Sequence, residues 1–592
     1  MGNTYDKDLK RLKIKVDDEM SKNLSQPTYS IKAQYNVLIP MRDGIRLSAD
    51  VYLPDKEGKY PVLLMRTYYG KCNFDLSNDE TGEFIRFFVE RGYVIVIQDC
   101  RGRYDSEGEF YPEIHEFEDG YDTIEWCGTQ KWSNGNVGMF GCSYPGCMCW
   151  SAAISGNKHL KCIAPRDATS DSYFNGGFMR GGVVQGWLSW CLHTAGRTSR
   201  KLEKEIDWRK VYTRLPLIDL DEYLGFNFPW WKDYFKHPCY DEYWERLSYE
   251  NKYDRVVAAS LNIGGWYSSS DIDGTINNFI GVRGKGKRFS AGTHHKLLIG
   301  PWPHCKIVTS FGEVKFGEEA NIDLKEVMLR WFDYWLKGKN TGIMEEPPVR
   351  YFLMGANKWC TAQNWPPEGV SFVRYYLHSN GRANSLYGDG ILSTEKPEDE
   401  KFDQYTYDPD NPVPFPLGDS ENVILDQRTV ERRDDVLVYS TPPLEEDVNV
   451  VGPIKAKIFA SSSCVDTDFV TKLVDVYPNG MAIFLTIGIV RARYRTSFKE
   501  PTLMKPGVIY EFDINMSNTA NQFRKGHMIR LEVSSSAFPY FLKNQNTGKD
   551  IGTDTEGIMA TQKIHHDRQY PSYIELPILE KPAYIVQKNK VG

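Results

Sequence analysis

The first regular pattern in the chain is an alternation of hydrophobic and polar positions in residues 34–40 and 45–53. A period of two places successive side chains on opposite faces of a strand. The segment between the two runs reads MRDG, which has the composition of a tight turn. The pattern therefore predicts a β-hairpin.

A different pattern follows, in which short apolar runs alternate with helical stretches. The apolar runs lie at residues 62–65, 93–97, 137–142, 161–164, 260–263 and 296–299. Helical patterns lie at residues 83–90, 117–127 and 324–336. Continuous apolar strands separated by helices are typical of a parallel sheet covered on both faces, so we expect an α/β core.

Two segments depart from this pattern. Residues 171–254 scatter six tryptophans among tyrosines and charges without strand periodicity, which we interpret as a helical insertion that caps the sheet. After Pro347, short strand-like runs that begin at 349–353 are separated by Gly, Pro and Asn, as in a jelly-roll sandwich. We therefore divide the chain into an N-terminal arm (1–30), an α/β core (31–170 and 255–345), a helical cap (171–254) and a jelly-roll domain (346–592).

Composition narrows the classes of partner. The net charge of −7 over 592 residues argues against nucleic acid, which would require a basic face. No apolar stretch approaches a membrane span, and the first residues lack a secretion signal, so we expect a cytoplasmic protein with no membrane partner. In that compartment the 12 cysteines are expected to be free thiols. Their spacing implies no metal, and we expect no cofactor.

The most informative candidate for chemistry is Ser143, in the segment VGMFGCSYPG at residues 137–146. Small residues around a serine at a strand end predict a sharp strand-to-helix turn, the nucleophile elbow of α/β-hydrolases. The alternative is an ordinary turn serine. In an elbow, the N–H of Tyr144 would lie at the helix start, where it could stabilise an oxyanion.

A histidine follows in the chain order of a Ser–acid–His triad. His304 comes directly after the 296–299 strand, and an imidazole suits proton transfer at neutral pH. A surface histidine is the alternative. His294 and His295 precede the same strand, at the opposite end of the sheet from Ser143, and are poor candidates.

The acid should follow the 260–263 strand, where Asp271 and Asp273 are the available carboxylates. We favour Asp271, because it comes first and is expected to lie in the loop. Asp273 lies closer to the expected helix start and could be an N-cap. An acid from elsewhere in the chain is the third alternative.

These motifs together resemble the cocaine esterase, X-Pro dipeptidyl peptidase and α-amino-acid ester hydrolase group, a family of CocE/NonD-type serine hydrolases. The resemblance rests on the elbow, the segment around Trp266 and the sequence GPWPH at 300–304. Further ordered matches are MRDGIRL at 41–47, QDCRGR at 98–103, GNVGM at 135–139, VGP at 451–453, DTDF at 466–469 and the segment 544–548. The resemblance covers nearly the whole chain and implies an α/β-hydrolase fold with a cap and a jelly roll.

The resemblance also implies a residue that spacing could not supply. In the family, a tyrosine in an RxPYxK segment donates its hydroxyl to the oxyanion hole. Residues 66–71 read RTYYGK, which points to Tyr69, with Tyr68 in place of the usual proline. An ordinary packing aromatic is the alternative for Tyr69.

A second departure concerns the acid. Family members place it one or two residues after the tryptophan, where this chain has Tyr267 and Ser268. Either the loop is longer and Asp271 reaches the same point, or the triad is altered. Amino-ester hydrolases of the family bind the substrate ammonium with a carboxylate cluster, to which Asp271 and Asp273 could belong instead.

We therefore expect a serine hydrolase that cleaves a small ester, an amide or a short peptide through an acyl-enzyme. Ser143 would attack the carbonyl, His304 would transfer the proton and Asp271 would orient the imidazole. The alternative is an acyltransferase or cyclising enzyme of a biosynthetic pathway, if the pocket excludes water. A binding protein with an inert core is a third class. A homodimer is compatible with the sequence.

Overall fold

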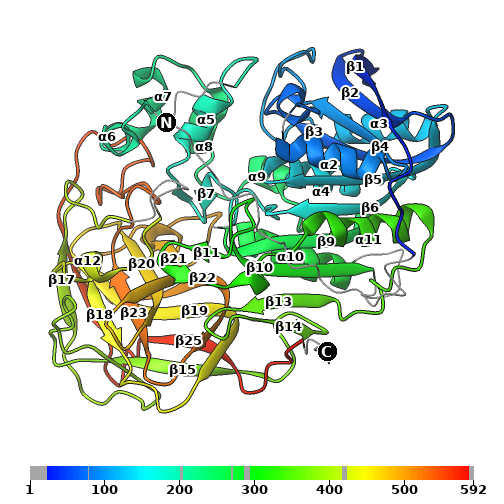
Figure 1. Ribbon diagram of the computed structural model, residues 1–592. Coiled ribbons are helices and arrows are strands. Elements are labelled where there is room, and N and C mark those ends of the chain that lie inside the picture. Colours follow the sequence, from blue (N-terminus) through cyan, green and yellow to red (C-terminus); the bar gives the residue numbers. More distant parts are fainter. Residues whose placement is uncertain are drawn as a thin grey trace, which may run out of the picture.

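The computed structural model describes residues 23–77, 79–199, 205–268, 271–285, 294–415 and 423–585. Most of the predicted N-terminal arm lies outside these ranges. An α/β part, a helical segment and a β-rich part lie against one another (Figure 1). No helix within the described ranges has the length and apolar composition needed to cross a membrane.

The α/β part is built on a ten-stranded sheet with the order β1-β2-β4-β3-β5-β6-β9-β10-β13-β14. Its strands are β1 (Ile31–Pro40), β2 (Arg46–Pro54), β3 (Tyr60–Thr67), β4 (Val94–Asp99), β5 (Ser133–Cys142), β6 (Leu160–Arg166), β9 (Ala259–Tyr267), β10 (His295–Pro303), β13 (Val349–Leu353) and β14 (Lys358–Ala362). The predicted hairpin is confirmed as the antiparallel pair β1–β2. The strands from β4 to β13 in this order are parallel neighbours, so their carboxyl ends meet at one edge.

The continuous apolar runs arise because both faces of the sheet are covered. Leu63 of β3 packs in one core with residues of helices α2 (Asp79–Val89) and α11 (Leu324–Lys337). Its neighbours Val62 and Leu64 pack in a second core with residues of α3 (Glu116–Thr129) and α4 (Tyr144–Ser155). Alternate side chains of one strand thus enter different cores, and neither face requires polar residues.

The prediction that residues 349–353 begin the jelly roll is wrong. This segment is β13, which pairs in parallel with β10 of the core sheet, and β14 then pairs antiparallel with β13. The cause is the helix α11 between β10 and β13, because a strand that follows a crossover helix returns to the same sheet in parallel. The sandwich therefore begins after β14 rather than at residue 346.

The inserted segment lies beside the α/β part and above the β-rich part in Figure 1, and its helices are short and joined by long irregular stretches. Its elements are β7 (Met179–Arg180), β8 (Val183–Val184), α5 (Leu188–His193), α6 (Trp208–Tyr212), α7 (Leu220–Tyr223), α8 (Pro229–Lys236) and α9 (Glu242–Leu247). Pattern analysis missed the short antiparallel pair β7–β8, which is too brief to show a period. Three of the cap tryptophans, Trp230, Trp231 and Trp244, are buried in a core that the cap shares with residues of the β-rich part such as Phe538 and Leu542.

The β-rich part is a sandwich formed by one continuous, folded sheet. Its strands are β15 (Val370–His378), β16 (Ile391–Ser393), β17 (Asp403–Tyr407), β18 (Leu437–Ser440), β19 (Val448–Ser462), β20 (Asp468–Val476), β21 (Ala482–Arg491), β22 (Tyr510–Phe523), β23 (Met528–Ser534), β24 (Ala560–His565) and β25 (Tyr573–Leu579).

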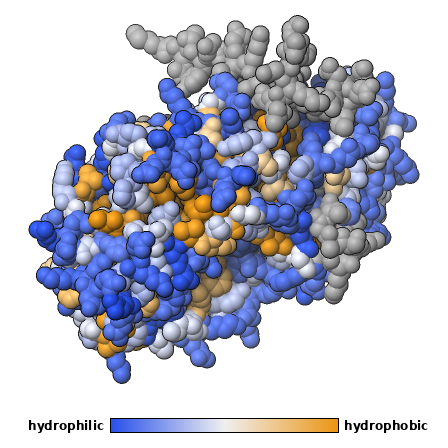
Figure 2. Space-filling view, turned by 90° about the horizontal axis from the view of Figure 1, so that it is seen from below, coloured by the Kyte–Doolittle hydropathy of each residue, from blue (hydrophilic) through white to orange (hydrophobic). Residues whose placement is uncertain are grey.

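Seen from below, the surface of the molecule is mostly hydrophilic, with apolar side chains gathered across its middle (Figure 2).

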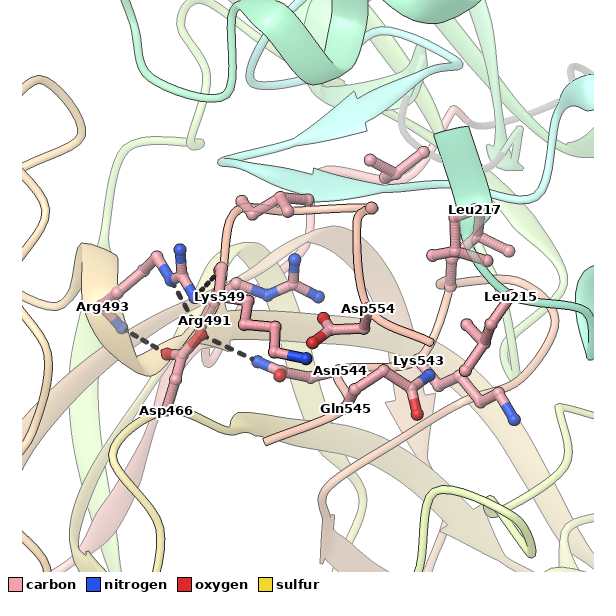
Figure 3. A pocket seen from close by; sticks show the side chains of 14 residues that line it. Leu215, Leu217, Asp466, Arg491, Arg493, Lys543, Asn544, Gln545, Lys549 and Asp554 are labelled. Carbon is pink, nitrogen blue, oxygen red and sulfur yellow. Dashed lines mark hydrogen bonds and ion pairs between the residues drawn. The ribbon is translucent and has the colours of Figure 1, made fainter. Parts of the chain in front are cut away.

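The cap and the sandwich meet around a small pocket with about 20 Å³ of free space (Figure 3). Asp466 accepts hydrogen bonds there from Arg493 Nε at 2.8 Å and Asn544 Nδ2 at 3.2 Å. Leu215 and Leu217 line it from the cap. The family-like segments at 466–469 and 544–548 thus form a junction between two parts of the fold, and no candidate triad residue lines this pocket.

Candidate active site

The predicted nucleophile elbow is present. β5 ends at Cys142, α4 begins at Tyr144, and Ser143 between them has φ 64° and ψ −132°. A Cβ at Gly141 would lie 2.5 Å from the carbonyl carbon of Pro145, and one at Gly146 would lie 2.7 Å from a backbone oxygen. Only glycine therefore fits at these two positions, and the strained serine is held by this close packing.

The residue after the serine lies where a helix offers free amide donors. Tyr144 is the first residue of α4, and the N–H groups of a first helical turn have no intrahelical partner. Its ring is fixed, because its hydroxyl accepts the N–H of Glu113 at 2.6 Å and donates to Glu116 Oε1 at 3.2 Å. Pro145 follows in the first turn, where proline removes no hydrogen bond.

Tyr69 lies in the loop after β3, close to the nucleophile. Burial raises the pKa of its hydroxyl, and hydrogen bonding with Tyr68, Trp190 and Ser143 opposes that rise. The ring centroids of Tyr68 and Tyr69 are 3.9 Å apart. Trp190 of the cap donates its indole N–H to the hydroxyl of the fully buried Tyr68. The tyrosine in place of the family's proline thus connects the cap to this loop.

His304 follows β10 at the carboxyl edge of the sheet. Its Nδ1 lies 3.2 Å from Asp271 Oδ2 and 3.0 Å from Ser268 Oγ. Burial lowers the pKa of His304, but the hydrogen bond and the charge of Asp271 outweigh that effect and raise it. His295, at the other end of β10, contacts Ser260 Oγ at 2.9 Å instead.

The two candidate carboxylates have different surroundings. Asp271 is the first residue of α10 (Asp271–Lys285), not a loop residue, and its N–H donates to Ser268 O at 3.1 Å. Asp273 lies within the first helical turn. Its side chain does not cap the helix, because it binds Arg180 Nη2 at 3.0 Å and two sandwich side chains of β22, Ser517 Oγ at 2.6 Å and Asn518 Nδ2 at 2.9 Å.

A disulfide contradicts the prediction that all cysteines are free thiols. Cys142 and Cys305, which adjoin Ser143 and His304, are bonded, with their Cα atoms 5.9 Å apart. The other ten cysteines are free. Composition could not show this bond, because its partners are 163 residues apart and meet only at the carboxyl edge of the sheet. Both sulfurs lie near the Asp167 carboxylate, but while bonded to each other they are not available as thiolate metal ligands.

Two side chains at this edge were not predicted. Ser268 contacts His304. Its position two residues after Trp266, in the segment where the resemblance places the acid, could have indicated that it lies near the histidine. Asp167 directly follows β6, and nothing in its sequence context distinguishes it from a turn aspartate.

Comparison with known proteins agrees with this architecture. Residues 43–306 match the X-Pro dipeptidyl-peptidase (S15) family, and residues 341–575 match the X-Pro dipeptidyl-peptidase C-terminal non-catalytic domain. The chain is 38% identical over 581 residues to cocaine esterase of Rhodococcus sp. strain MB1 Bresler, with 93% of this chain and 99% of that protein covered.

Solved structures extend the likeness to three dimensions. An aminopeptidase from a marine sediment Thaumarchaeota archaeon and an α-amino acid ester hydrolase each give a TM-score of 0.81 at 26% identity, over 94% of this chain and 97% of theirs. The predicted α/β-hydrolase core with a helical cap and a jelly-roll domain is confirmed. The chain is a serine hydrolase that cleaves esters or peptides, and it belongs to the family of cocaine esterase and the X-Pro dipeptidyl-peptidases.

Proposed function

We propose that Ser143, His304 and Asp271 form the catalytic triad of an esterase. The observation that carries this proposal is the 3.2 Å contact between Asp271 Oδ2 and His304 Nδ1. Ser143 is held in the elbow conformation, and the Cys142–Cys305 bond joins its segment to that of His304. Asp271 would keep the Nδ1 proton in place, so that Nε2 is free to accept the hydroxyl proton of Ser143.

The reaction then proceeds through a covalent acyl-enzyme. The Ser143 oxygen attacks the substrate carbonyl while its proton passes to His304, which returns it to the leaving group. The Tyr69 hydroxyl and the Tyr144 N–H would donate to the oxyanion of the tetrahedral intermediate. Water attacks the acyl-enzyme by the same route in reverse and releases the acid.

The surroundings favour an ester without a free amine near the reacting carbonyl. A carboxylate that held a substrate ammonium would need to lack a cationic partner, but Asp273 is already bound to Arg180. Aromatic rings cluster next to the nucleophile, since Tyr68 packs against Trp190 and against Tyr144, the residue after Ser143, with centroid distances of 5.2 and 4.7 Å. Such a wall suits a bulky apolar acyl or leaving group. The similar Rhodococcus protein is named a cocaine esterase, which is consistent with an ester substrate.

A labelling experiment tests the nucleophile. A fluorophosphonate probe should label the protein once, and Ser143→Ala should abolish the labelling. Ser155→Ala, at the other end of the same helix α4, is the matched control and should retain it. Labelling that persists in Ser143→Ala would refute the assignment.

Product analysis tests the substrate class. An aryl ester with an apolar acyl group should be hydrolysed faster than a matched amino-acid ester and than an X-Pro anilide. The alternative function, acyl transfer or cyclisation by the same acyl-enzyme, predicts that an added amine or alcohol captures the acyl group in preference to water.

The domain limits, the homodimer and the cytoplasmic location stay predictions. We place the core at 31–170 and 255–345 with the addition of β13 and β14, the cap at 171–254, and the jelly roll after them. Sedimentation of the purified protein and cell fractionation would test the other two. The Cys142–Cys305 bond makes the location informative, because disulfides are rare in reducing compartments.

A further inference from the structure

A buried carboxylate outside the proposed triad lies where the active-site loops meet. Asp167 directly follows β6, and only 1% of its surface is exposed. Its Oδ2 accepts the backbone N–H of Cys305 at 2.8 Å, and its Oδ1 accepts that of Gly265 at 3.2 Å. Cys305 adjoins His304, and Gly265 lies in β9, which leads toward Asp271.

The backbone at this point also contacts the nucleophile segment. The carbonyl of Arg166 accepts the N–H of Ser143 at 2.9 Å, and the N–H of Asp167 donates to Ile263 O of β9 at 2.9 Å. Asp167 has φ 46°, a left-handed conformation that most residues avoid but that aspartate and asparagine tolerate. The end of β6 therefore has polar contacts with all three segments that carry the triad.

The charges around His304 come from a small set of groups. Asp271 at the start of α10 and Asp167 at the end of β6 both favour the imidazolium, and Arg166 opposes it. Arg166 Nε lies 3.4 Å from Asp167 Oδ2. Asp271 is in turn influenced by Asp167 and by Arg180 of the cap.

We propose that Asp167 is a positioning residue of the reaction, whose carboxylate holds the His304 loop against β9 and adds a second negative charge beside the imidazole. The proposal rests on the role of His304 as the general base. Loss of either hydrogen bond loosens the loop, and a shift of about 1 Å at the base can lower the rate by roughly 10²-fold. The carboxylate does not touch the imidazole ring, so it acts through Cys305 and through its charge.

The test is Asp167→Asn, because asparagine keeps the side-chain size and tolerates the same backbone conformation. Its amide retains one acceptor oxygen, so the variant loses the charge and one of the two hydrogen bonds from Cys305 and Gly265. With an aryl ester, kcat should fall roughly ten- to hundred-fold, with little change in KM. The acid limb, which is the fall of kcat/KM as the pH is lowered, should also shift to lower pH. His304 must be neutral to accept a proton, and removing a negative charge lowers its pKa, so the variant should keep its activity to lower pH than the wild type does.

Asp333→Asn is the matched control. Asp333 on α11 is fully buried and accepts the N–H of Ser25 at 2.7 Å and the hydroxyl of Tyr93 at 2.6 Å. Tyr93 precedes β4, at the amino edge of the sheet away from His304. This variant should lose stability without any movement of the acid limb.

Two results would overturn the proposal: an unchanged kcat, or a fall in kcat with an unmoved acid limb. If Asp167→Asn does not fold, Asp167→Gly suits the same φ and removes the same charge, and the same readings apply. Failure of the proposed triad is distinguishable, because the wild-type enzyme would then show no acid limb and no Ser143 labelling.

Discussion

The assignment of Asp271 as the triad acid can be tested by removing its charge. Asp271→Asn preserves the shape of the side chain and removes the charge that lies 3.2 Å from His304 Nδ1. The amide no longer stabilises the imidazolium, and it can present an N–H toward Nδ1, which favours the wrong tautomer. In a Ser–His–Asp enzyme this change lowers kcat by about 10⁴, or about 5.5 kcal/mol of transition-state stabilisation.

Asp273→Asn is the control, because the same chemical change is made two residues away. Asp273 faces Arg180, Ser517 and Asn518, and no contact joins it to His304. Breaking its ion pair affects the junction of cap, core and sandwich rather than the imidazole. We expect kcat for an aryl ester without an amine to fall less than ten-fold, with a lower melting temperature.

Rescue provides the decisive step. Ser268 Oγ already lies 3.0 Å from His304 Nδ1, and Ser268 is one of the two positions after Trp266 at which the resemblance places the acid. Ser268→Asp in the Asp271→Asn background should therefore place a carboxylate near Nδ1 and restore kcat by at least roughly ten-fold, since a base–carboxylate contact is regained. If Asp271→Asn alone leaves turnover within ten-fold of the wild type, the acid lies elsewhere and the reasoning is refuted.

Two further predictions concern the oxyanion hole and the disulfide. Tyr69→Phe should lower kcat by roughly 10²–10³ with little change in KM, and a near-normal kcat would exclude the hydroxyl from the hole. Replacing Cys142 and Cys305 by alanine opens a loop with a sequence separation of 163, for which chain entropy gives a loss of about 5 kcal/mol. Calorimetry should show a melting temperature lower by about 4 °C if all 592 residues unfold together, and an unchanged value would contradict the bond.

The core sheet could be predicted because its strands are buried on both faces. A run such as 62–65 has no polar position, since Leu63 and its neighbours enter two different cores. The elbow was predictable for a related reason, as Gly141 and Gly146 have no room for a side chain. Local steric constraints and burial determine which residue types are allowed at a position, so they can be inferred from the sequence.

Contacts between distant segments cannot be inferred from local sequence in this way. Cys142 and Cys305 look like two more small packing residues, and Asp167 looks like a turn aspartate, until the sheet brings their strand ends together. The wrong placement of β13 has the same origin, because its own composition fits either sheet and only its crossover helix decides between them. What was missed is therefore defined by tertiary neighbours, not by local composition.

The proposed triad acid, Asp271, depends both on its own place in the chain and on a contact with a distant segment. His304 requires a negative charge at one point in space, and a residue at either of two chain positions can supply it. Ser268, at one of the two positions where the resemblance places the acid, has a hydrogen bond with Nδ1, while Asp271 reaches the same nitrogen from the first position of α10. Burial raises the pKa of Asp271, and the hydrogen bond and charge of His304 oppose that rise. A carboxylate at a helix start is also favoured by the helix dipole. The family's geometry can thus be retained while its sequence motif is lost.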